Sequence, residues 1–268
     1  MKNRLFKSLK AILKSQNWKI ILVMVLITGI ACSPIYYHRI AVPVDTDYGS
    51  HVVVAQQLLD GKGLDPLHLS HPILQLVMIA MHLASGRVLG LYASLMILQV
   101  LVQIFTVLIL YFWIGPAERK HWDCLRAGAA LSITLVAPIM LLAFQDKLFY
   151  FGYIGMANYH NPTIHLLKPF ALLSFIYAIR CIDGNNTSWK GILMAAFLTI
   201  FSAFIKPNFI MSILPALALA AGIRWLQRRS IDWKLLFYGF FIPGFLTLTA
   251  QWLVAFFFNN TDEHILFA

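Results

Sequence analysis

The sequence predicts an all-α polytopic membrane protein, on the evidence of its composition and of the length of its apolar runs. Hydrophobic residues make up 60% of the 268 residues and charged residues only 12%, against about 45–50% and about 25% in soluble domains. The apolar runs are continuous, as membrane helices require, whereas a transmembrane β-barrel would show alternating segments of about ten residues. We expect about seven crossings in one membrane domain over residues 1–268, plus a helical segment on the outer face after the first span.

The chain opens with a basic amphipathic segment, residues 1–19, in which six Lys or Arg residues are interspersed with apolar ones. This pattern is typical of a helix on an anionic inner leaflet. The alternative is a cleavable signal peptide, but no A-x-A-like site follows it. We therefore expect a cytoplasmic N-terminus, a first span over about residues 20–37, and a location in the inner (plasma) membrane.

The remaining spans follow from the other apolar runs. They are residues 88–114, 127–144, 166–177 with its flanks, 191–205, 209–223 and 235–257. The run over residues 73–85 is too short to cross, since a crossing takes about 20 residues. Treating it as re-entrant or interfacial places fifteen of the 21 basic residues inside, six in the N-terminal segment and nine in later connections, as the positive-inside rule favours.

The basic residues are therefore explained by topology, and we expect no nucleic-acid partner despite the net charge of +10. The three cysteines show no CxxC spacing, which argues against both a disulfide framework and a zinc site.

Candidate functional residues gather in the connections expected outside. The first outer loop, residues 41–72, holds four of the eleven acidic residues and three of the nine histidines, and Asp47 to Leu59 within it is expected to form a short surface helix. A second outer loop covers residues 145–165. The candidates are Asp45, Asp47, His51, His71, Arg87, Tyr159, His160, Asn161, His165, Lys168 and Lys206. Carboxylates near cations and imidazoles at a hydrocarbon boundary suit a lipid-linked substrate that carries phosphate.

The order of these features resembles the GT-C superfamily of integral-membrane glycosyltransferases. The matching residues after the first span are Asp45-Thr46-Asp47-Tyr48, Ala55 to Leu59 with Gly61, and His71-Pro72. The resemblance covers the N-terminal third, and elsewhere only the topology agrees. It departs from the family where many members carry Lys-Pro-Pro in place of His71-Pro72. The chain also ends at Ala268, soon after its last span, which indicates either a minimal family variant or an incomplete chain.

The resemblance implies an activity and a catalytic base. A sugar would pass from a polyprenyl-phosphate donor to a glycan, lipid or protein acceptor of the cell envelope, with Asp47 taking the acceptor's proton. Negative charge would develop on the departing phosphate, with Lys168, Lys206, Arg87 and His165 as the expected cations. Attack opposite the phosphate would invert the anomeric centre, and a Mg²⁺ or Mn²⁺ ion held by Asp45 or His51 is an alternative source of positive charge.

Structural roles compete with these functional ones. Asp47 could act only as a helix N-cap, Asp45 as a solvated loop residue, and Lys206 as an interfacial anchor. His51, His160 and His165 could be satisfied surface or interfacial residues. Two other classes of protein also remain open, namely a transporter or flippase of lipid-linked sugars and a non-catalytic GT-C-like membrane subunit.

Overall fold

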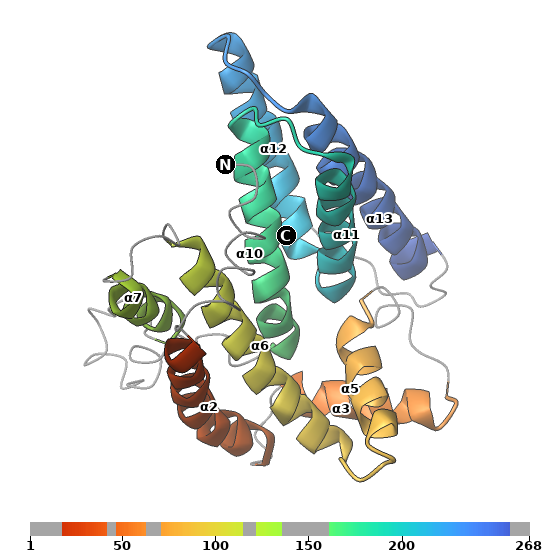
Figure 1. Ribbon diagram of the computed structural model, residues 1–268. Helices are drawn as coiled ribbons and strands as arrows, with labels where there is room; N and C mark the ends of the chain where they lie inside the picture. Colours follow the sequence, from red (N-terminus) through yellow and green to blue (C-terminus); the bar gives the residue numbers. More distant parts are fainter. Residues whose placement is uncertain (1–17, 42–46, 63–70, 115–121, 136–160, 258–268) are drawn as a thin grey trace, which may run out of the picture. The chain divides into compact units, whose positions relative to one another are not determined.

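The computed structural model describes residues 18–41, 47–62, 71–114, 122–135 and 161–257, and all regular structure within these ranges is helical (Figure 1). Five helical segments among the described residues are long and apolar enough to cross a membrane. They lie in α2 (Trp18–Ala41), α6 (Leu91–Trp113), α10 (Pro162–Ile182), α12 (Asn208–Leu226) and the continuous run of η2 (Leu235–Phe241), α13 (Ile242–Trp252) and η3 (Leu253–Phe257). The predicted class, a multi-pass helical membrane protein, is consistent with these spans, and the count of seven crossings stays a prediction.

Four shorter helices complete the described structure: α3 (Asp47–Leu59), α5 (Ile73–Ala84), α7 (Asp123–Leu135) and α11 (Trp189–Ile205). The bounds of α3 are those predicted from the sequence. At 1.5 Å per residue, the 12 residues of α5 reach only about 18 Å, well short of a hydrocarbon core about 30 Å thick. The basic segment 1–19 lies outside the described residues up to position 17, as do the second half of the predicted span 127–144 and most of the loop 145–165.

The chain forms two compact units. The first comprises Met1–Val52 and Met78–Leu173, and the second comprises Val53–Val77 and Ser174–Ala268.

In the first unit, α2 and α6 run antiparallel. Met24 near the start of α2 packs with Leu110 and Tyr111 at the end of α6, whereas Tyr36 near the end of α2 bonds to Gln103, further back along α6. The last residues of α2 and the first residues of α6 are therefore on the same side. This direction agrees with the prediction that the short helix α5, which lies between them in the sequence, does not cross.

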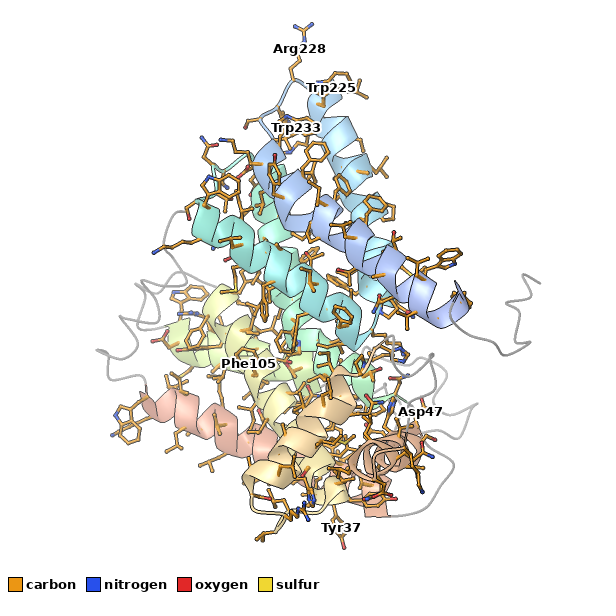
Figure 2. All side chains as sticks on the ribbon, turned by 90° about the vertical axis from the view of Figure 1, so that its right-hand side faces the viewer. Tyr37, Asp47, Phe105, Trp225, Arg228 and Trp233 are labelled. Atoms are coloured by element: carbon orange, nitrogen blue, oxygen red, sulfur yellow. The ribbon has the colours of Figure 1, made fainter. Side chains whose placement is uncertain are left out.

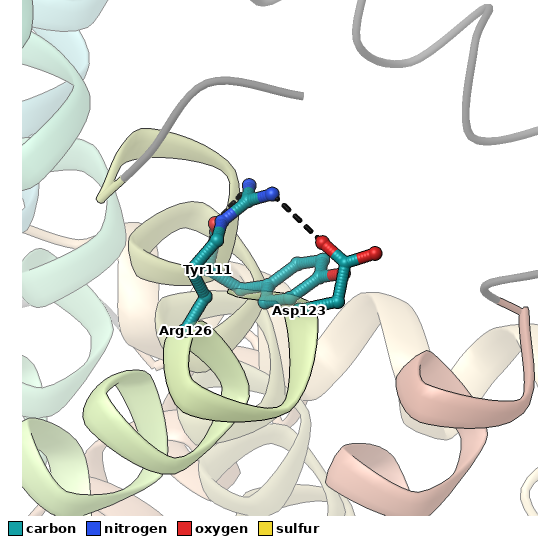
Figure 3. Close-up of polar contacts among 3 residues, drawn as sticks. All are labelled: Tyr111, Asp123 and Arg126. Atoms are coloured by element: carbon teal, nitrogen blue, oxygen red, sulfur yellow. Dashed lines mark hydrogen bonds and ion pairs between the residues drawn. The ribbon is translucent and has the colours of Figure 1, made fainter. Parts of the chain in front are cut away.

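A buried arginine of α7, paired with an aspartate of the same helix, fastens α7 to the end of α6 (Figure 3). Arg126 Nη1 donates to Asp123 Oδ1 at 3.0 Å, and Nη2 donates to the backbone oxygen of Tyr111 at 2.8 Å. The guanidinium carbon also lies 4.7 Å from the centroid of the Tyr111 ring. Tyr111 belongs to the last turn of α6, whose carbonyl groups lack intrahelical donors and attract positive charge. The span predicted from the sequence begins at residue 127, but the helix α7 already begins at Asp123.

The second unit holds the end of α10, then α11, α12 and the run from η2 to η3 around a core that includes Ala195, Ile210, Leu214 and Phe240. The helices α11 and α13 follow the same direction. Thr199 bonds to Gly239, and Ala203, further along α11, is contacted by Gln251, further along α13.

Two prolines explain both of these contacts. Gly239 lies in the π-helical run η2, where Ile242 N–H bonds five residues back to Phe237, and Pro243 supplies no N–H at the next position. The hydroxyl of Thr199 donates to the Gly239 carbonyl at 2.8 Å. Pro207 likewise leaves the Ala203 carbonyl without its usual donor, and Gln251 Nε2 donates to it at 2.9 Å. Because a bilayer core supplies no water, each freed carbonyl needs such a side chain from a neighbouring helix.

Candidate functional site

A cluster of buried polar side chains in the first unit joins α2, α6 and α10. Tyr36 Oη and His165 Nδ1 are 3.2 Å apart, and their rings meet edge to face with centroids 5.6 Å apart. Gln103 Nε2 donates to Tyr36 Oη at 3.2 Å and lies 3.4 Å from His165 Nδ1. Tyr36 is 2% exposed, and both His165 and Gln103 are 0% exposed. Polar groups buried inside membrane spans are costly, so such a cluster is a candidate functional site.

The start of α10 sets the direction of two predicted site residues. Asn161 Oδ1 accepts hydrogen bonds from the backbone N–H of Thr163, at 3.1 Å, and from the Thr163 hydroxyl. Asn161 is thus the N-cap, and Pro162 occupies the first helical position, where its missing N–H costs nothing. The substrate-binding role expected for Asn161 stays a prediction beside this capping role.

His165 and Lys168 both face α2, as their spacing of three residues on a helix predicts. His165 meets Tyr36, as described above. The Lys168 ammonium lies close enough to the buried thiol of Cys32, one helical turn before Tyr36, for the two groups to interact electrostatically. The side chain of Lys168 is only partly exposed. The imidazole of His165 therefore contacts α2 at Tyr36, and the ammonium of Lys168 interacts electrostatically with the same helix at Cys32.

The first residues of α3 lie close to this cluster. Tyr48 is 2% exposed and lies close enough to Tyr36 for electrostatic interaction between the two phenols. His51, one turn after Asp47, is also buried. Asp47 itself opens α3 (Figure 2), its side chain is exposed, and it makes no hydrogen bond or ion pair with any described residue. A capping bond from its carboxylate to Gly49 or Ser50 is absent from the described contacts.

The other predicted site residues are distributed between the two units. Arg87 is exposed in the turn after α5, in the first unit, with φ at 68°. His71 and Lys206 are partly buried in the second unit, at the start of α5 and between α11 and α12 respectively. Asp45, Tyr159 and His160 lie outside the described residues.

Sequence reasoning missed three members of the cluster: Tyr36, Gln99 and Gln103. The signal available was the spacing of four residues between the two glutamines in an otherwise apolar run, which places both on one helix face. Gln99 Nε2 donates to the backbone oxygen of Pro162 at 3.2 Å. The Oε1 atoms of Gln99 and Gln103 are buried and have no hydrogen-bond partner among the described residues. They are free to accept hydrogen bonds from hydroxyl groups.

Within the described ranges, no group of three or more His, Cys, Asp or Glu side chains is arranged to hold a metal ion. The expected alternative of Mg²⁺ or Mn²⁺ therefore stays a prediction, because Asp45 falls outside those ranges. No family model, curated protein or solved structure matches the chain. The described fold is all-helical and consistent with a multi-pass membrane protein, and it holds a polar cluster buried between α2, α6 and α10.

Proposed function

We propose that the chain is a membrane-embedded glycosyltransferase that moves a sugar from a polyprenyl-phosphate donor to an acceptor of the cell envelope. The observation that carries the proposal is the buried polar cluster that joins α2, α6 and α10 beside the first turn of α3. Tyr48, next to Asp47, lies near Tyr36, and Tyr36 in turn contacts His165. The candidate base Asp47 directly precedes Tyr48, and the candidate phosphate-binding cation Lys168 follows His165 by three residues, which supports a shared site.

The reaction assigns a distinct task to each group. The acceptor hydroxyl gives its proton to the Asp47 carboxylate while its oxygen forms a bond to the anomeric carbon. The bond from that carbon to the phosphate oxygen breaks, and its electron pair leaves with the polyprenyl phosphate. The ammonium of Lys168, in partly dry surroundings, stabilises the charge that develops on the phosphate. Arg87 and Lys206 are the further cations expected from the sequence.

The buried glutamines supply a means of holding the sugar. The Oε1 atoms of Gln99 and Gln103 have acceptor capacity left, and a sugar presents several hydroxyl donors. Holding the donor and the acceptor in line accounts for much of the rate gain in a transfer of this kind.

The test compares two carboxylates at the two ends of α3, one in its first turn and one directly after its last residue. Asp47→Asn removes the candidate base, and Asp60→Asn is the matched control, because Asp60 is also exposed and immediately follows α3, where its Oδ1 accepts from Gln56 Nε2 at 2.8 Å. Mass spectrometry of cell-envelope glycans, from cells with and without each variant, measures transfer. We expect Asp47→Asn to lower transfer by about 10²–10⁴-fold, the usual contribution of a general base, and Asp60→Asn to retain it. Full transfer by Asp47→Asn would refute the mechanism.

A second candidate, a flippase of lipid-linked sugars, is favoured by the depth of the cluster, since Gln103 lies midway along α6. Transport pathways use polar groups at such positions. Vesicles that contain the full chain and a labelled polyprenyl-phosphate sugar, but no acceptor, separate the two functions. A flippase moves the lipid between leaflets and is indifferent to Asp47→Asn, whereas the transferase requires the acceptor and Asp47. A non-catalytic subunit would show neither activity.

A further inference from the structure

Two connections at one end of the second unit carry an excess of positive charge. Residues 180–190 and 224–234 contain six basic residues and only two acidic ones, a surplus of four positive charges. Both connections follow or precede membrane-length helices, since α10 ends at Ile182, α12 ends at Leu226 and η2 begins at Leu235. We call the two connections together the cationic platform.

Both acidic residues of the platform are committed to internal contacts. Asp183 Oδ1 accepts from Arg224 Nη2 at 3.0 Å. Asp232, which is 5% exposed, accepts from the backbone N–H of Thr187 at 2.7 Å and from that of Leu235 at 3.1 Å. Neither carboxylate is available to neutralise the remaining exposed cations.

The same contacts hold the two connections together as a preformed surface. The backbone N–H of Asp232 donates to the Cys181 carbonyl at 3.0 Å, and Cys181 Sγ donates to the Asp232 carbonyl at 3.4 Å. Gly184, with φ at 67°, packs so tightly on Ser230 that an added Cβ would lie 2.6 Å from the Ser230 carbonyl oxygen. A surface fixed in this way loses little conformational entropy when it binds a ligand.

Four cations and three indoles project from this surface. Lys190, Arg228, Arg229 and Lys234 are exposed and form no ion pair among the residues that the structure describes. Trp189, Trp225 and Trp233 are 59%, 67% and 45% exposed. Figure 2 shows Arg228 beyond Trp225 and Trp233 at the tip of this end. Tryptophan collects at the boundary between hydrocarbon and headgroups, which is also the depth at which lipid phosphates are found.

We propose that the cationic platform binds the phosphate headgroups of anionic phospholipids. The three indoles lie at the boundary between hydrocarbon and headgroups, and the four cations contact phosphate oxygens on the headgroup side of that boundary. An acidic protein partner would account for the charge, but exposed indoles next to the ends of membrane-length helices favour a lipid surface. The inference is independent of the proposed sugar transfer, because no residue of the platform belongs to that site.

The test measures binding of a fluorescent phosphatidylglycerol to the purified full chain in mixed micelles at low ionic strength, where charges are least screened. Arg228→Gln/Arg229→Gln removes two cations of the platform. The control, Lys62→Gln, removes one exposed cation that lies outside both the platform and the proposed sugar-transfer site, and it should leave binding unchanged. Basic residues near an anionic surface contribute roughly a fivefold gain in affinity each, so we expect the platform variant to bind about thirtyfold more weakly.

Three further arms identify the ligand. Phosphatidylcholine, inorganic phosphate and a polyglutamate peptide are each added as competitors of the fluorescent lipid. We expect unlabelled phosphatidylglycerol to displace the probe at concentrations at which none of the three does. Equal loss of binding in the control variant, unchanged binding in the platform variant, or displacement by phosphate or by the acidic peptide would each overturn the inference.

Discussion

We predict that the contribution of the Thr199–Gly239 hydrogen bond to stability depends on a third residue, Pro243. Thr199→Val keeps the shape of the side chain and removes its hydroxyl. The buried Gly239 carbonyl oxygen then loses this hydrogen-bond donor. Thr199 is 0% exposed, so water cannot replace the lost contact. Hydrogen bonds between membrane helices contribute about 0.6 kcal/mol on average and up to about 1.7 kcal/mol. A buried acceptor left unpaired falls at the upper end of this range. We therefore expect Thr199→Val to lower the free energy of unfolding by about 1–2 kcal/mol.

The decisive comparison repeats this substitution in a Pro243→Ala background. Alanine at position 243 carries the backbone N–H that proline lacks, so the Gly239 carbonyl gains a donor within its own helix. In this background we expect Thr199→Val to lower the free energy of unfolding by less than about 0.5 kcal/mol. The difference between the two backgrounds is a coupling energy, which independent sites do not show. Thr247→Val is the control, since the Thr247 hydroxyl donates at 2.7 Å to Pro243 within its own helix.

The assay is the free energy of unfolding of the full chain in mixed micelles, titrated with a denaturing detergent and followed by circular dichroism. An equal loss from Thr199→Val in both backgrounds would refute the reasoning, because Pro243 would then have no part in the need for the threonine. A loss of the same size from Thr247→Val would also refute it, since that hydroxyl serves no carbonyl that a proline has freed.

Two further predictions use the same assay. Arg126→Met removes the guanidinium that pairs with the buried Asp123 carboxylate. We expect the free energy of unfolding to fall by about 3–5 kcal/mol. A fall of less than about 1 kcal/mol would show that the pair behaves as an exposed one. Gly184→Ala introduces a Cβ against the Ser230 backbone at positive φ, and we expect a loss above about 2 kcal/mol. The control Gly222→Ala, with nothing within 4 Å of the added carbon, should be neutral or stabilising by up to about 1 kcal/mol. Equal effects of the two glycine substitutions would contradict the tight contact.

The membrane helices could be predicted from the sequence because bilayer thickness imposes a length on each apolar run. The predicted span 88–114 corresponds to α6, and the run 73–85, judged too short to cross, corresponds to α5. The surface helix α3 was predictable for a local reason, as Asp47 favours a helix start and Asp60-Gly61 favours a turn. The seven-residue π-helix η2 was not, because π-type bonding has no clear local signal.

Within the candidate site, only the relation between residues on the same helix could be predicted from the sequence. The spacing of His165 and Lys168 predicted a shared face, and both residues do face α2. The partner of His165 could not be predicted, since Tyr36 is far away in sequence and the neighbours of a helix depend on tertiary packing. The pairing of Asp123 with Arg126 was hidden for the opposite reason, because the charged residues around it resemble a solvated connection.

The antiparallel course of α2 and α6 has a consequence for how this membrane protein can be mapped. Gly61 and Gly86 are turn residues on either side of α5, and both have open space around them. Reporter domains inserted at these two positions are expected in the same compartment, because the helix between them is too short to cross. Whichever compartment that is, it also receives the carboxylate that opens α3.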